Sequence, residues 1–133
     1  MEATAKRIGV LVAEDNRDLC LAVCELIAEE PDMVVTGSVH RVKDFLDVVH
    51  TTSADVVVLD LDLAGESSIP GLQALRAAQP GIAVVLFSGH DRALLAHEFR
   101  QAPNFEYVTK NGDPAQLLSA IRRVAQMKTG AGD

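Results

Sequence analysis

Apolar residues follow two patterns along the chain, short continuous runs and longer segments with a helical period. The continuous runs are rich in β-branched residues and predict five strands, at Ile8–Ala13, Met33–Val39, Val56–Leu59, Ile82–Phe87 and Phe105–Val108. The segments with apolar residues three or four positions apart predict five helices, over residues 17–30, 42–49, 70–79, 92–100 and from 114 onward. Strands and helices therefore alternate along the whole chain.

This alternation predicts an α/β fold, in which a parallel sheet is covered by helices on both faces. The strands are apolar almost throughout, as expected for strands whose two sides are both buried. A chain of 133 residues suits one domain with a single core. We therefore expect one doubly wound (βα)5 domain with a core over about residues 7–127. Residues 128–133 are expected to be a frayed tail or the start of a linker.

The last predicted helix has the most clearly marked start. Asp113 is suited to the N-cap, Pro114 to the first helical position, and Gln116 to the third position of a capping-box-like arrangement. Leu117 and Ile121 then begin the apolar face, which we interpret as core.

Composition and charge narrow the classes of partner. The chain is 48% hydrophobic and 23% charged, with a formal net charge of −7, which argues against direct binding of nucleic acid or an anionic membrane by this segment. No apolar run approaches the ~20 residues of a membrane span, and residues 1–10 lack the apolar stretch of a signal peptide. A cytoplasmic location is therefore expected. Cys20 and Cys24 lack metal or redox spacing, and we interpret them as packed side chains.

Polar residues stand where four of the five predicted strands end. Glu14-Asp15 ends the first, Asp60 the third with Asp62 just beyond, Ser88-Gly89 the fourth and Thr109-Lys110 the fifth. In open α/β sheets, ligands bind beyond the carboxyl ends of the strands, so these groups are expected to converge. No glycine-rich phosphate-binding loop follows any strand, which excludes dinucleotide-binding and P-loop proteins.

Converging carboxylates repel one another and raise each other's pKa unless a cation joins them. Mg²⁺ prefers oxygen ligands and is commonly bound by one or two carboxylates, water and a phosphate. Asp60 could act as a nucleophile toward phosphorus, with Lys110 and Ser88 donating hydrogen bonds to phosphoryl oxygens.

Each of these groups also has a simpler interpretation. Glu14 and Asp15 could complement a helix N-terminus, and Asp60 could be a structural ion-pair partner of Lys110. Ser88 could cap a helix, and Asp62 could be a solvated loop residue. These alternatives stay open at the level of single residues.

Four motifs together resemble the receiver domain of two-component response regulators. They are ED at 14–15, VVVLDLDL with Asp60, FSG with Ser88, and YVTK with Lys110, in family order and each at the end of the appropriate strand. The resemblance covers about residues 7–127. It implies a flavodoxin-like sheet with the strand order 2-1-3-4-5.

The resemblance also implies a role for each acidic residue. Asp60 is the phosphoacceptor, and Mg²⁺, with Mn²⁺ as the alternative, is the metal. Asp15 resembles the main metal ligand and Glu14 a ligand acting through water, with Asp60 itself in the ligand set. Asp62 resembles the residue that binds the metal through its backbone carbonyl, with a side chain that influences phosphoryl lifetime.

A second group of residues is implied to detect the phosphoryl group. Ser88, followed by the small residue Gly89, matches the switch hydroxyl, and Lys110 matches the phosphate-binding lysine. Tyr107 matches the aromatic switch, whose ring is expected to move inward, although an ordinary half-exposed strand aromatic is the simpler interpretation.

The function implied is signalling by self-modification, not turnover of a substrate as in an enzyme. A histidine kinase or phosphotransfer protein would supply the phosphoryl group, and the surface of the fourth helix, fifth strand and fifth helix would respond. A homodimer through this surface is an option without direct support from the sequence. The domain either acts alone or is the N-terminal receiver of a longer DNA-binding regulator.

The sequence departs from the family pattern in the segment 64–70, which lacks the usual proline and is two or three residues longer. Asn111 replaces the usual proline after Lys110, so a cis peptide is not predicted there. The segment KNGDPAQLLSAIRRV is more similar to receivers of LuxR-type regulators.

Two competing functions remain at this stage. The Asp60-Leu61-Asp62 motif superficially resembles that of dehalogenase-type phosphatases, but theirs lies on the first strand. The other alternative is an interaction module that is not phosphorylated.

Overall fold

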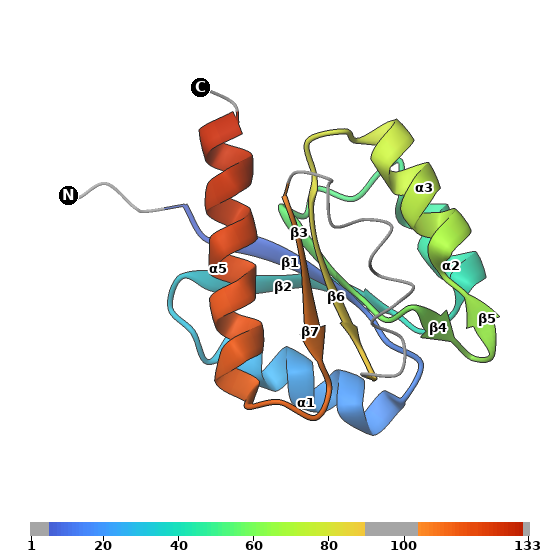
Figure 1. Cartoon of the computed structure of the whole chain (residues 1–133), viewed down its shortest axis with the longest axis horizontal. Coiled ribbons are helices and arrows are strands. Elements are labelled where there is room, and N and C mark those ends of the chain that lie inside the picture. Colours follow the sequence, from blue (N-terminus) through green and yellow to red (C-terminus); the bar gives the residue numbers. More distant parts are fainter. Residues whose placement is uncertain (1–5, 90–103, 132–133) are drawn as a thin grey trace.

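The computed structural model describes residues 6–89 and 104–131, which form a parallel sheet between two layers of helices (Figure 1). The sheet order is β2-β1-β3-β6-β7, and every neighbouring pair in it is parallel. These strands are β1 (Ile8–Ala13), β2 (Met33–Val39), β3 (Val56–Leu59), β6 (Ala83–Ser88) and β7 (Phe105–Thr109). Since β6 and β7 are the fourth and fifth strands of this sheet along the chain, the predicted α/β fold and the order 2-1-3-4-5 are confirmed.

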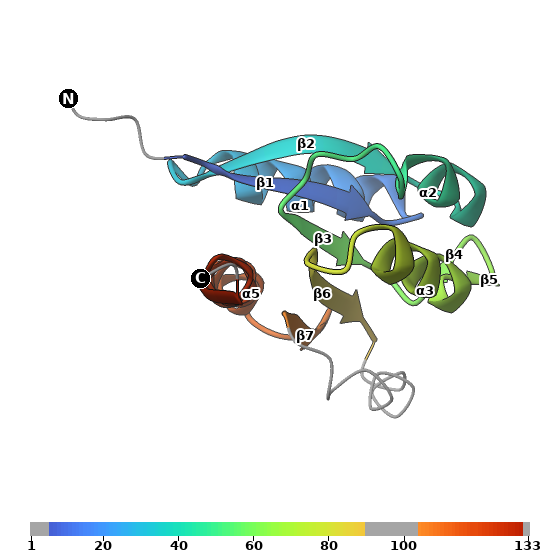
Figure 2. The ribbon, with the colours of Figure 1, turned by 90° about the horizontal axis from the view of Figure 1, so that it is seen from above.

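The helices within the described residues cover the two faces of the sheet in pairs (Figure 2). One face packs against α1 (Arg17–Ala28) and α5 (Pro114–Ala131), and the other against α2 (Val42–Val48) and α3 (Ile69–Ala78). Along β1, Val10 belongs to the first core cluster and Leu11 to the second, because successive side chains of a strand point to opposite faces. Both sides of the strands are therefore apolar, which explains the continuous runs in the sequence.

Several element boundaries differ slightly from those predicted. Strand β6 begins and ends one residue later, β7 continues to Thr109, and α3 begins and ends one residue earlier. Helix α5 continues to Ala131, so residues 128–131, expected as a tail or the start of a linker, are helical. The helix predicted over residues 92–100 lies outside the described residues.

Local signals at α1 and α5 behave as expected. Asp113 Oδ1 accepts a hydrogen bond from the Ala115 N–H at 2.9 Å, which confirms its role at the start of α5. Cys20 is buried and Cys24 is half-buried in α1, both as free thiols. Burial, with the neighbouring Cys20, raises the pKa of Cys24 to about 11, which is typical of a packed thiol and not a reactive one. Among the described residues, no helix is both long and apolar enough to cross a membrane.

The lengthened segment after Asp60 forms a short hairpin that the sequence did not predict. Strand β4 (Asp62–Leu63) pairs antiparallel with β5 (Glu66–Ser67), and Ala64 and Gly65 form the two-residue turn. Both turn residues have positive φ, 54° and 84°, as in the type I′ turn that matches the twist of a hairpin. Leu63 is fully buried, so the hairpin is anchored in the core beside α3 (Figure 1).

Replacing Ala64 by asparagine should stabilise the protein. Alanine at a left-handed position is strained by roughly 1 kcal/mol, and Asn-Gly is the preferred pair for this turn. We expect Ala64→Asn to raise the free energy of unfolding in urea by about 0.5–1 kcal/mol. The matched control is Ala77→Asn on the exposed side of α3, which should lower stability because asparagine is a weaker helix former than alanine. A loss of stability in Ala64→Asn would contradict this account of the turn.

Candidate functional site

The carboxyl ends of β1, β3, β6 and β7 bring the predicted polar residues to one edge of the sheet. Asp60 directly follows β3, Glu14 follows β1, Ser88 is the last residue of β6, and Lys110 follows β7. Parallel pairing with a shared register places these positions side by side, since Leu59 pairs with both Ala13 and Leu86. The expected convergence is therefore observed.

Asp60 lies at the centre of this group and is only 5% exposed. Its Oδ1 accepts hydrogen bonds from the Ser88 hydroxyl and the Asp62 N–H, both at 3.1 Å. Its Oδ2 contacts Lys110 Nζ at 2.6 Å. Both carboxylate oxygens thus have donors directed at them.

Lys110 also reaches Glu14, whose Oε1 lies 2.8 Å from Nζ. Glu14 is 2% exposed, and its Oε2 accepts a hydrogen bond from the Asn16 N–H at 3.1 Å. Burial raises the pKa of Glu14, and the charge of Asp60 adds to the rise, despite the opposing contacts with Lys110 and Asn16. Burial alone would lower the pKa of Lys110, but hydrogen bonds to Asp60 and Glu14 outweigh it and the pKa is raised. Lys110 is therefore held in its charged form.

Asp15 completes a cluster of three carboxylates. Glu14, Asp15 and Asp60 each offer one oxygen, and these oxygens lie within 4.8 Å of one another. Asp15 is exposed, and its Oδ2 accepts a hydrogen bond from the Ala64 N–H at 3.0 Å. Although burial opposes the change, this contact helps to lower the pKa of Asp15, so the group is ionised at neutral pH. Three carboxylates facing one lysine leave an excess of negative charge, which fits a hard divalent cation such as Mg²⁺.

The remaining predicted residues lie around this cluster. Asp62 is half-buried at the start of β4 and donates its N–H to Asp60. Tyr107 is half-buried on β7, and its hydroxyl donates to the carbonyl oxygens of Ser88 and Gly89. The structure therefore connects Ser88, Gly89 and Tyr107 directly, with the Ser88 hydroxyl already directed at Asp60.

Sequence reasoning missed three residues that support the site. Asn16 caps α1 through its side chain and binds Glu14 through its N–H. His40 Nδ1 lies 2.9 Å from the Glu14 carbonyl oxygen. Ser68 is fully buried, and its hydroxyl donates to the Asp60 carbonyl oxygen at 2.6 Å. Asn16 had a recognisable helix-cap signal, whereas the role of His40 depends on a contact 26 residues away and that of Ser68 on the shape of the turn that joins it to Asp60.

Comparison with known proteins identifies the family. A family model described as the response regulator receiver domain matches residues 10–122. The chain belongs to this family. The resemblance carried by the four strand-end motifs is thereby confirmed.

Curated relatives are full regulators of greater length. The chain is 26% identical over 120 residues to a nitrate/nitrite response regulator homologue of Haemophilus influenzae, covering 90% of this chain and 58% of the relative. It is also 26% identical over 121 residues to the transcriptional regulatory protein DesR of Bacillus subtilis, covering 91% of this chain and 60% of DesR. This receiver thus spans little more than half the length of these relatives.

Solved structures agree with the fold. A LuxR-family two-component response regulator from Aurantimonas has a TM-score of 0.78 and 26% identity, covering 91% of this chain and 86% of that one. The response regulator domain of CheB from Thermotoga maritima has a TM-score of 0.79 and 20% identity, covering 91% and 98%, and so shares the fold.

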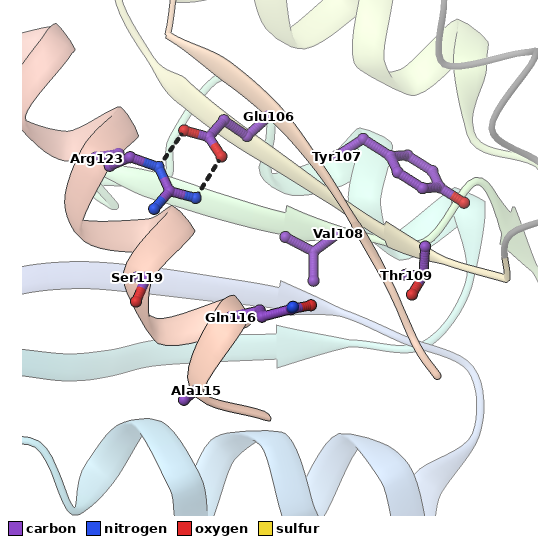
Figure 3. Close-up of a pocket in the computed structure, with 8 residues that line it drawn as sticks. All are labelled: Glu106, Tyr107, Val108, Thr109, Ala115, Gln116, Ser119 and Arg123. Carbon is purple, nitrogen blue, oxygen red and sulfur yellow. Dashed lines mark hydrogen bonds and ion pairs between the residues drawn. The ribbon is translucent and has the colours of Figure 1, made fainter. Parts of the chain in front are cut away.

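A groove lies along β7 and α5 of the receiver, on the surface that the resemblance implicates in signalling (Figure 3). Its volume is about 520 Å³. Arg123 of α5 spans it with two hydrogen bonds of 2.7 Å to the Glu106 carboxylate of β7. Tyr107 also borders this groove, but its ring points away from α5 (Figure 3), and its hydroxyl donates to the Ser88 carbonyl oxygen.

Replacing Glu14 by glutamine should stabilise the metal-free protein at neutral pH. Because the folded state raises the pKa of Glu14, it binds the proton more tightly than the unfolded chain, and stability falls as pH rises through the folded pKa. Glutamine resembles the neutral form and removes this loss. In EDTA, urea unfolding should show Glu14→Gln more stable than wild type at pH 7, with the difference disappearing below pH 4. A Glu14→Gln protein less stable than wild type at pH 7 would contradict the assigned burial penalty.

Proposed function

We propose that this receiver takes a phosphoryl group onto Asp60 from the phosphohistidine of a histidine kinase or phosphotransfer protein. The observation that carries the proposal is the environment of Asp60. The buried Asp60 carboxylate accepts hydrogen bonds from the Ser88 hydroxyl and the Lys110 ammonium. It also belongs to the cluster of three carboxylates with Glu14 and Asp15. A structural ion pair would need Lys110 alone, and the additional carboxylates would only destabilise it.

The reaction requires little covalent chemistry from the protein. An Asp60 carboxylate oxygen attacks phosphorus, the phosphorus–nitrogen bond breaks, and the departing histidine nitrogen keeps the electron pair. Bound Mg²⁺, held by Asp15, Asp60 and the Asp62 carbonyl with Glu14 acting through water, would neutralise charge on the phosphoryl oxygens. Positioning and charge neutralisation supply most of the rate in phosphoryl transfer. Water later hydrolyses the acyl phosphate, so the protein is a self-modifying switch and not a turnover enzyme.

The new charge would be detected by the groups that now contact Asp60. Ser88 and Lys110 would donate to phosphoryl oxygens, and Tyr107 would respond to the movement of the Ser88–Gly89 segment, to which its hydroxyl is bound. The groove along β7 and α5 would then change shape, shifting the population toward an active surface. Homodimerisation through this surface is one way in which that change could be used.

A second groove offers a docking place for the phosphodonor. It has a volume of about 210 Å³ and is mainly apolar, with Leu19 and Leu26 of α1 on one side and Pro114 and Leu117 of α5 on the other. Lys110 lies at its edge, so an amphipathic helix in this groove would reach the site. The nitrate/nitrite regulator homologue and DesR are longer than this chain. We infer that this receiver either controls an output domain or acts alone through protein contacts.

The dehalogenase-type alternative is disfavoured by the position of the aspartates. Asp60 and Asp62 follow β3, whereas β1 is followed by Glu14-Asp15, and in those phosphatases the aspartate pair follows the first strand.

Treatment with a small-molecule phosphodonor and Mg²⁺ tests the proposal directly. Intact-protein mass spectrometry should show the gain of one phosphoryl group in wild type and no gain in Asp60→Asn, which lacks the nucleophilic carboxylate. Asp62→Asn is the matched control and should still gain the phosphoryl group, because we assign its carbonyl and not its carboxylate to the metal. The absence of any gain in wild type, or an equal gain in Asp60→Asn, would overturn the proposal.

A further inference from the structure

Ser68 occupies a helix-capping position but does not cap its helix. It is the N-cap residue of α3 and is fully buried, and its side chain makes no capping hydrogen bond. An N-cap serine ordinarily accepts from an N–H of the first helical turn. Here the neighbouring hydroxyl of Ser67 accepts from the Ile69 N–H at 3.2 Å. The Ser68 hydroxyl is therefore available for another contact.

That contact is with the main chain of Asp60. The Ser68 Oγ donates to the Asp60 carbonyl oxygen at 2.6 Å, and the Ser68 N–H donates to the Leu61 carbonyl oxygen at 2.7 Å. On its other side, the Asp60 N–H donates to the Ala13 carbonyl oxygen of β1 at 3.1 Å. The main chain of Asp60 is thus held from both sides, by the sheet and by Ser68.

The contact has consequences for the neighbouring peptide groups. The Asp62 N–H donates to the Asp60 carboxylate, so the orientation of the 60–62 backbone decides where Asp60 Oδ1 lies. The same backbone carries the Asp62 carbonyl that we assign to the metal. A shift of even ~1 Å at such a position can lower a reaction rate by as much as 10²-fold.

The same loop holds the site from a second direction. The Ala64 N–H at the tip of the β4–β5 hairpin donates to Asp15 Oδ2 at 3.0 Å. Leu61 and Leu63 are fully buried, so the hairpin is anchored in the core through its first strand, whereas residues 64–67 are exposed. Groups that hydrogen-bond metal ligands orient them and strengthen metal binding.

We propose that Ser68 is a positioning residue for phosphoryl transfer, and that the lengthened β4–β5 loop delivers its hydroxyl to the main chain of Asp60. This inference rests on the proposed phosphorylation of Asp60. The extra residues of this loop then support the site, and they are not simply a solvated insertion.

Ser68→Ala tests the proposal, with Ser67→Ala as the matched control one residue away. Three quantities are measured: the Mg²⁺ dissociation constant by isothermal titration calorimetry, the phosphorylation rate constant at saturating phosphoramidate and Mg²⁺, and the urea unfolding midpoint. In Ser68→Ala the rate constant of the folded protein should fall by about 10-fold and Mg²⁺ should bind more weakly, as for other groups that orient metal ligands. Ser67→Ala should match wild type in both.

Ser68→Cys covers the case in which Ser68→Ala folds poorly. The thiol keeps the shape of the side chain but is a weak donor, so an intermediate rate constant is expected. A purely structural role would lower only the unfolding midpoint, and a wild-type rate constant in folded Ser68→Ala and Ser68→Cys would overturn the proposal. An equal loss of rate in Ser67→Ala would overturn it as well. A wild type that takes no phosphoryl group would instead refute the proposed function, so the two failures are distinguishable.

Discussion

The double contact of Lys110 with Asp60 and Glu14 is the interaction on which the site depends. Two nearly buried carboxylates at neighbouring strand ends repel each other and lose hydration, and the raised pKa of Glu14 shows this penalty. The Lys110 ammonium, just beyond the edge strand β7, reaches both carboxylates at 2.6 and 2.8 Å. This geometry requires β7, β6, β3 and β1 to end at one level, so the topology of the sheet is a condition for the chemistry.

The bodies of the central strands build the core, and the residues at their carboxyl ends build the site. The central strands β1, β3 and β6 are apolar on both sides because α1 and α5 cover one face and α2 and α3 the other. In the central strands β1, β3 and β6, charged groups therefore stand only beyond the strand ends. Leu61 and Leu63 continue the buried pattern beyond β3, which anchors the hairpin and leaves its main chain beside Asp15 and Asp60. The lengthened loop is thus an extension of the core as well as a wall of the site.

Family membership and local geometry contribute different parts of this account. The receiver match covers residues 10–122 and establishes the class of protein. The Tyr107 hydroxyl donates to the Ser88 and Gly89 carbonyl oxygens and so joins β7 to the end of β6, and a groove lies between β7 and α5. The Glu106–Arg123 pair closes one end of that surface by joining strand to helix.

The sequence alone determined the strands, the four described helices that cover them, and the strand ends at which Glu14, Asp60, Ser88 and Lys110 stand. Periodicity and helix signals are local, so they can be recognised in the sequence without a structure. The order of the strands came from the family resemblance. Only the tertiary structure decided the hairpin, the positive φ of Ala64 and the roles of Ser68 and Ala64 at the site. A serine pair before Ile-Pro-Gly indicates no more than a helix start. Its contact with Asp60 joins residues eight apart through a turn whose shape depends on packing Leu63 into the core.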